Sequence, residues 1–156
     1  MELLDLRDYP LPFFDEMMPP EMLKGNYSSE VAKKWAAKIA EGDAFIIIAP
    51  EYNHGYPAVL KNALDYVFYE WNNKPVGFVG YGEVGGARSI EQLRGVVNTL
   101  QMVPVPKALH IRNVREAFDE KGELKDLTLP EHAGKLIDRV KWWGDLLKKG
   151  RAEQTA

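Results

Sequence analysis

Two runs of apolar residues without polar alternation occur along the chain. The first extends from Ala44 to Ala49, and the second from Pro75 to Gly82. A continuous apolar run is typical of a strand in a parallel sheet, because helices cover both faces of such a sheet and bury both rows of side chains. The two runs therefore predict strands of a parallel sheet.

Four other segments carry apolar residues at helical spacing. They are Ser28 or Ser29 to Gly42, Pro57 to about Trp71, a helix after Gly86 that carries Ile90 and Leu93, and Thr128 to Gly150. Ser28 or Ser29 can cap the first helix, and Thr128 with Glu131 has the spacing of a capping box. We expect Gly42 and Gly150 to end their helices.

Shorter or weaker signals fill the remaining chain. Glu2 to Leu6 and Ala108 to Ile111 have the composition of short strands, and residues 13–27 predict a loop with at most one helical turn. The alternation of strands and helices predicts an α/β fold with a doubly wound parallel sheet in three layers. We find no linker, so we expect one domain over residues 1–156.

The segment from Pro57 to Trp71 is apolar over more than one helical stripe, although a helix needs only one stripe to face its own core. Either the helix is deeply buried, or its second stripe contacts another subunit. We favour the second interpretation, which predicts a homodimer or a tetramer.

Composition narrows the class of protein. The net charge is -3 and no basic run exceeds a pair, which argues against nucleic-acid binding. Cysteine is absent, which excludes a disulfide framework and a thiolate metal site. Residues 1–12 do not have the pattern of a signal peptide, and no apolar run has the length of a membrane-spanning helix. We expect a cytoplasmic enzyme without a membrane or nucleic-acid partner.

The loops after the two predicted strands hold the candidate site. Pro50, Glu51, Tyr52 and Asn53 follow the first strand, and Gly82, Gly85 and Gly86 follow the second. In open α/β sheets, ligands bind at the carboxyl ends of the strands. We expect the backbone N–H groups of residues 51–53 to face a ligand, and the glycines to allow close backbone approach.

Other interpretations of these loops stay open. Both can be ordinary connections from strand to helix, and His54 can be a loop histidine without a catalytic role. Arg88 can either contact the phosphate of a nicotinamide cofactor or lie on the helix surface, and we favour the surface. We see no metal site and no nucleophile elbow, so no catalytic side chain is assigned.

Pro50-Glu51-Tyr52-Asn53, followed by Leu60-Lys61-Asn62-Ala63-Leu64-Asp65, resembles the NADPH-dependent FMN reductase family, which has a flavodoxin-like fold. The resemblance implies that residues 50–53, with Gly82, Gly85 and Gly86, bind the flavin ring of FMN. It also implies an oxidoreductase that uses NADPH or NADH to reduce a flavin, quinone or azo-type small-molecule acceptor. The cofactor carries the reactive atoms, so no protein base is required.

The resemblance covers Glu2 to about Leu147, and the family's first strand and its Gly-Ser-x-Arg-x-x-Ser phosphate loop have no counterpart. We therefore expect the first β-α unit to be missing. Either residues 3–6 then pair with Ala44 to Ala49, or another chain fills the gap. An alternative function is a truncated, non-catalytic homologue or subunit that acts through protein–protein association.

Overall fold

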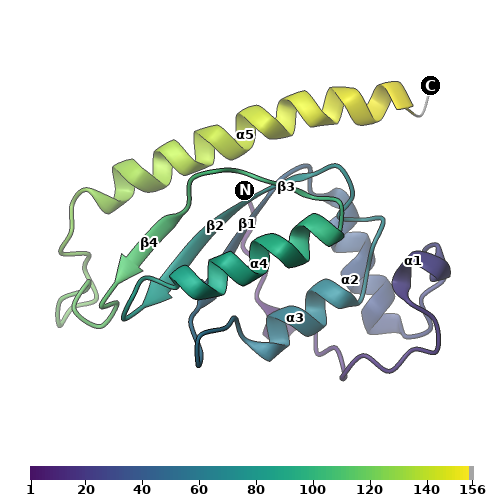
Figure 1. The fold of residues 1–156 in the computed structure, drawn as a ribbon, viewed down its shortest axis with the longest axis horizontal. Helices are drawn as coiled ribbons and strands as arrows, with labels where there is room; N and C mark the ends of the chain where they lie inside the picture. The colour runs from purple at the N-terminus through teal and green to yellow at the C-terminus, as the bar shows by residue number, and fades with distance from the viewer. Residues whose placement is uncertain (155–156) are drawn as a thin grey trace. The chain divides into compact units, whose positions relative to one another are not determined.

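The computed structural model describes residues 1–154, which form two compact units. One unit contains residues 1–42 and 58–72, and the other contains residues 43–57 and the chain from residue 73 onward. The second unit holds all the strands and both loops of the candidate site (Figure 1). The assignment of the chain to a single domain stays a prediction.

A four-stranded parallel sheet forms the centre of the second unit. β2 (Pro75–Gly82) lies beside β1 (Phe45–Pro50), with Phe45 opposite Val76 and Pro50 opposite Tyr81. The other side of β2 pairs with β3 (Val103–Pro104) and with β4 (Leu109–Arg112). The predicted α/β class, the parallel sheet and the two apolar strands are thus confirmed.

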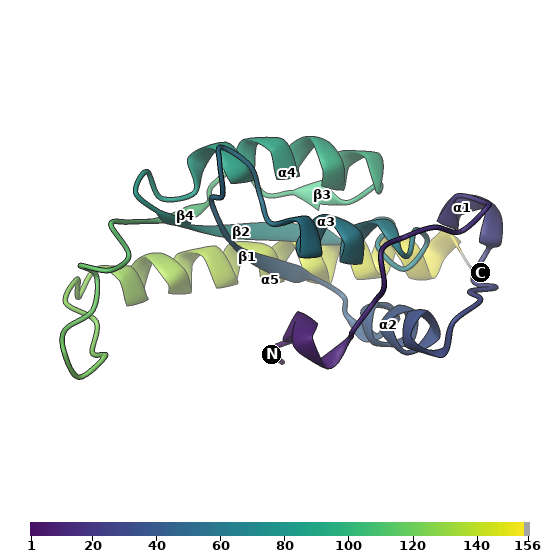
Figure 2. The same ribbon diagram turned by 90° about the horizontal axis from the view of Figure 1, so that it is seen from below.

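Helices α4 (Ala87–Thr99) and α5 (Leu129–Gln154) cover opposite faces of this sheet (Figure 2). A Cβ at Gly77 would lie 2.7 Å from Val140 of α5, whereas one at Gly80 would lie 2.7 Å from Ile90 of α4. Residues three apart in a strand point to opposite faces, which agrees with this arrangement. Small residues in β2 therefore let both helices pack closely on the central strand.

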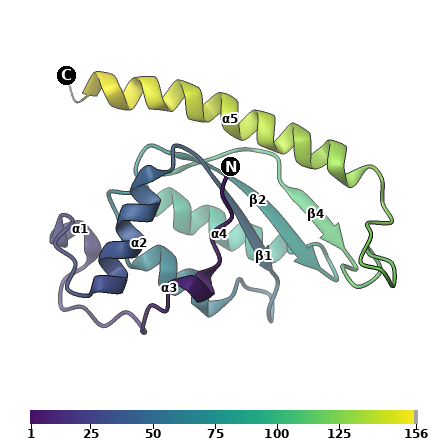
Figure 3. The ribbon, with the colours of Figure 1, turned by 180° about the vertical axis from the view of Figure 1, so that it is seen from behind.

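The first unit contains α2 (Glu30–Glu41), α3 (Ala58–Asp65), the short α1 (Pro20–Leu23) and the 3-10 helix η1 (Leu6–Asp8), drawn in purple in Figure 3. Ser29 caps α2 by accepting a hydrogen bond from the Ala32 N–H at 3.1 Å, as the sequence predicts. The buried Trp35 side chain donates to the Ala63 carbonyl at 2.8 Å and joins α2 to α3.

The predicted strand from Glu2 to Leu6 is wrong. Residues 1–5 have no regular secondary structure, and Asp5 instead caps η1 by accepting from the Arg7 N–H at 2.9 Å. Within the described residues, β1 pairs only with β2, so the expected pairing of residues 3–6 with this strand does not occur. A segment with the composition of a strand becomes one only when a partner edge accepts its backbone hydrogen bonds.

Two predicted helix ends are also wrong. α3 ends at Asp65 rather than Trp71, and Tyr66, Val67 and Trp71 are buried in the turns that follow. The rings of Tyr66 and Trp71 contact aromatic rings of the same unit, so part of this apolar surface packs inside its own unit. At the other end of the chain α5 continues past Gly150, where the Arg151 side chain donates to the Asn73 carbonyl at 2.7 Å.

None of the helices formed by residues 1–154 combines the length and apolar character needed to cross a bilayer.

Candidate functional site

The loops after β1 and β2 begin side by side. Pro50 is opposite Tyr81 in the parallel register, and the Glu51 N–H donates to the Tyr81 carbonyl at 3.2 Å. Both loops therefore leave the carboxyl edge of the sheet at the same place, which is the usual position of a ligand site in this class of fold. The sequence predicted this meeting of the two loops.

The first loop is a tight turn over residues 52–55, which we call the 52–55 turn. Tyr52 and Gly55 exchange backbone hydrogen bonds of 2.8 and 2.9 Å. At its tip, Asn53 and His54 are both left-handed, with φ of 49° and 69°. Positive φ is uncommon in non-glycine residues, although Asn and His adopt it more readily than most, and the two bonds between Tyr52 and Gly55 close the turn around them.

The second loop depends on glycine. Gly82, Gly85 and Gly86 have φ of 140°, 71° and 66°. A Cβ at Gly86 would lie 2.7 Å from the Gly80 Cα, so this loop packs directly on the backbone of β2. This close backbone approach is to the protein's own strand, and the expected approach of these glycines to a ligand stays a prediction.

Glu51 connects the two loops through its side chain, which is only 8% exposed. Its carboxylate accepts from the Arg88 N–H at 3.1 Å and from the Arg88 guanidinium at 2.6 Å. Gly86, the N-cap residue of α4, has no side chain that could accept a hydrogen bond from the first helical turn. Glu51, in the other loop, accepts the bond from the Arg88 N–H instead. The hydrogen bond from Arg88 holds the pKa of Glu51 below its ordinary value.

A hollow of about 200 Å³ lies between these loops, and we call it the site hollow. Six residues line it: Glu51, Asn53, His54, Glu83, Val84 and Arg88. Of the residues predicted from sequence, Glu51 and Asn53 line the site hollow, while the other five shape the surrounding backbone. The other four lining residues were not predicted as site residues: His54 was expected only as a loop histidine, and Glu83, Val84 and Arg88 lie within or directly after the second glycine-rich loop.

These residues fit part of a flavin. The N–H groups of Glu51 and Tyr52 are already hydrogen-bonded within the protein, so the expectation that residues 51–53 all present free amides is wrong for these two. The site hollow is smaller than the ~300–1,000 Å³ of typical small-molecule pockets, so it can accept one edge of the ring system. The lining includes the carboxylates of Glu51 and Glu83, and the guanidinium of Arg88 is paired with Glu51. Such a lining suits a neutral ring rather than a phosphate.

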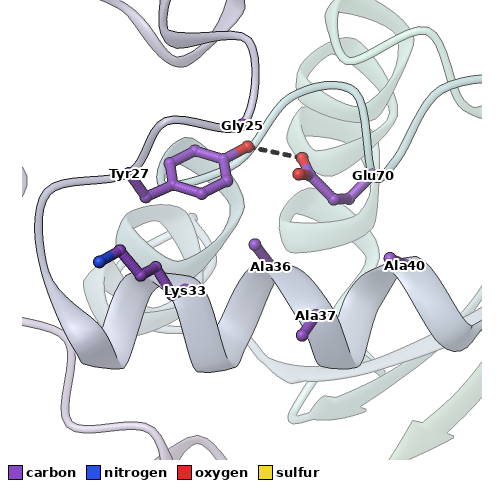
Figure 4. Close-up of a pocket in the computed structure, with 7 residues that line it drawn as sticks. All are labelled: Gly25, Tyr27, Lys33, Ala36, Ala37, Ala40 and Glu70. Carbon is purple, nitrogen blue, oxygen red and sulfur yellow. Dashed lines mark hydrogen bonds between the residues drawn. The ribbon is translucent and has the colours of Figure 1, made fainter.

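A second hollow, of about 250 Å³, lies in the first unit (Figure 4). Its polar pair is Tyr27, whose hydroxyl donates to Glu70 at 2.6 Å, and burial raises the pKa of this phenol. Three alanines of α2 form much of the remaining wall. Tyr27 and Glu70 satisfy each other and the lining Lys33 pairs with Glu30, so this hollow does not point to a ligand. Within residues 1–154, no group of three acidic, histidine or cysteine side chains is arranged to hold a metal ion.

Comparisons with known proteins agree with the geometry. Residues 1–116 match the protein family described as NADPH-dependent FMN reductase. An NAD(P)H-dependent FMN reductase of Schizosaccharomyces pombe is 46% identical over 105 residues, which are 67% of this chain and 52% of the yeast protein. A 2-hydroxy-1,4-benzoquinone reductase of a Burkholderia species is 30% identical over 73% of this chain and 67% of its own length.

A solved structure shares the fold. The flavoenzyme NAD(P)H:(acceptor) oxidoreductase of Paracoccus denitrificans superimposes with a TM-score of 0.63 at 27% identity, over 90% of this chain and 76% of that one. Our chain thus spans about half the length of the S. pombe relative and about three quarters of the Paracoccus structure.

Proposed function

Because the chain belongs to the NADPH-dependent FMN reductase family, we propose that it binds FMN and supports NAD(P)H-dependent reduction of a quinone-type or related small-molecule acceptor. The observation that carries the proposal is the site hollow, where the family-like segment at residues 50–53 meets the glycine-rich loop at the carboxyl edge of the sheet. The names of the relatives support the acceptor class.

When bound, FMN would supply the chemistry, since a flavin accepts a hydride from a nicotinamide and passes electrons on. The protein's part is to bind and orient the ring. Asn53 lines the site hollow, and Tyr52, which directly precedes it in the chain, is 62% exposed and does not line the hollow. Glu51 and Arg88 neutralise each other and keep the two loops together.

The test is a titration with FMN and, separately, with riboflavin, which lacks the phosphate. We expect the flavin fluorescence to fall on binding and its visible absorption bands to shift. The residues of the site hollow contain no cation free of a carboxylate partner, so the two dissociation constants should agree within about tenfold, equivalent to about 1.4 kcal/mol.

Other results would contradict this assignment. A flavin spectrum that is unchanged by protein at millimolar concentration would reject the site. A hundredfold preference for FMN would show that a phosphate site exists outside the site hollow. Oxidation of NADPH or NADH in the presence of FMN and a benzoquinone then tests the activity itself.

A second candidate function is association with another protein without catalysis. The observation in its favour is the outer side of β1, which pairs with no strand among residues 1–154. Flavin binding without any NAD(P)H oxidation would favour this candidate. Homodimer or tetramer formation and a cytoplasmic location both stay predictions.

A further inference from the structure

The left-handed tip of the 52–55 turn is held from α4. The side-chain amide of Gln92 donates to the His54 carbonyl at 2.7 Å. A Cβ at Gly55 would lie 3.3 Å from the Gln92 side-chain oxygen, so the same amide also packs against the end of the turn. Gln92 itself is not among the residues that line the site hollow.

Gln92 and Arg88 lie four residues apart in α4, so their side chains extend from the same face of the helix. Arg88 binds Glu51 at the beginning of the first loop, and Gln92 binds His54 at its tip. The loop is therefore attached to one helix face at two points, on either side of Asn53. Because Asn53 and His54 line the site hollow, its shape depends on the conformation of this turn.

We propose that Gln92 is a positioning residue, whose amide keeps Asn53 and His54 left-handed and so completes the wall of the site hollow. The proposal rests on the proposed function for its ligand, but the contact with the turn stands independently of flavin. The conformation is unfavourable for non-glycine residues, and loss of a donor that stabilises it should let the turn open.

The experiment uses two substitutions at Gln92 and one control. Gln92→Met removes all polar contact, and Gln92→Glu keeps the shape of the side chain but cannot donate to a carbonyl at neutral pH. Asn98→Met removes an exposed amide farther along the same helix and serves as the control. Two measurements are made: hydrogen exchange at the Tyr52 and Gly55 amides, and the FMN dissociation constant.

Both Gln92 variants should exchange at Tyr52 and Gly55 about tenfold faster and bind FMN about three- to tenfold more weakly, with unchanged exchange in β2. Asn98→Met should match the unsubstituted protein. If Gln92→Glu behaves like the unsubstituted protein, or if exchange accelerates while FMN affinity stays constant, the proposal is wrong. If the unsubstituted protein binds no FMN while the exchange effect is present, the flavin assignment fails and the control of the turn by Gln92 is supported.

Discussion

At the scale of single residues, the contact between Gly86 and β2 makes the sharpest prediction. Gly86→Ala would place a Cβ 2.7 Å from the Gly80 Cα, at a φ of 66° that non-glycine residues rarely adopt. Backbone atoms cannot move aside as a flexible side chain can, so we expect a loss of at least ~2 kcal/mol in the free energy of unfolding.

The control for this substitution is Gly95→Ala in the same helix. No atom lies within 4 Å of the Cβ that alanine would add at Gly95, and its φ is not positive. Replacing a helical glycine by alanine should then stabilise the protein by ~0.5–1 kcal/mol. Urea unfolding of both variants measures the difference, and equal stabilities would show that the second loop does not pack on β2.

Glu51 predicts a pH dependence. Arg88 lowers the pKa of Glu51 in the folded protein, so the pair contributes stability above the ordinary pKa of 4.5 and loses it as the pH falls through the lowered value. Glu51→Gln should therefore destabilise the protein at about pH 7 and have little further effect near pH 2. Chemical denaturation of both proteins across this range checks the sign, and a difference that grows toward acid would contradict the role of the ion pair.

At the scale of elements, the C-terminal turn of α5 is attached to the beginning of β1. Arg151 binds the Asp43 carboxylate and the Asn73 carbonyl, each at 2.7 Å, and its side chain is largely buried. We expect Arg151→Met to cost ~1 kcal/mol, because charge-assisted hydrogen bonds are lost at a partly exposed site. Lys149→Met, at an exposed position of the same helix, should change the stability by less than ~0.5 kcal/mol.

The contacts of Arg151 also show which features of the elements can be predicted from the sequence and which cannot. Strands β1 and β2 follow from composition, because a short continuous apolar run bounded by turn residues favours a strand of a parallel sheet, although only β2 is largely buried. The end of α5 could not be predicted in this way. Glycine commonly ends a helix, so Gly150 was expected to end α5, but the groups that bind Arg151 beyond it come from distant parts of the chain. Local pattern therefore predicts the buried centre of an element more reliably than its end.

The candidate site also has features that the sequence predicts and contacts that it does not. The loop positions follow from the order of the strands, and the need for glycine at residues 82, 85 and 86 follows from their place before a helix. The contacts of Glu51 with Arg88 and of Gln92 with His54 join residues 37 and 38 positions apart. Arg88 is exposed on its helix, as expected, but local spacing predicts neither its ion pair with Glu51 nor the contact of Gln92 with His54.

At the scale of the whole molecule, the prediction of a homodimer can be tested on α3. Val59 is 58% exposed on this helix, whereas most of the apolar residues after Asp65 are buried. If α3 contacts a second copy, light scattering should show about twice the chain mass of 17.7 kDa, and Val59→Asp should shift the protein toward the monomer. Leu3→Asp, another exposed apolar position, is the control and should leave the mass unchanged.

The outer side of β1, which pairs with no strand among residues 1–154, also affects how the protein must be handled. The strand is apolar along its length, Ile48 is 58% exposed, and neither a charge nor a bulge interrupts the strand. Such an edge is a template on which further strands can add, and addition of this kind depends on concentration. A concentrated stock should therefore form ordered aggregates on standing, even far below its melting temperature, while a dilute stock stays clear. A lysine at position 48 would then extend storage life without changing the melting temperature, as natural proteins protect their sheet edges.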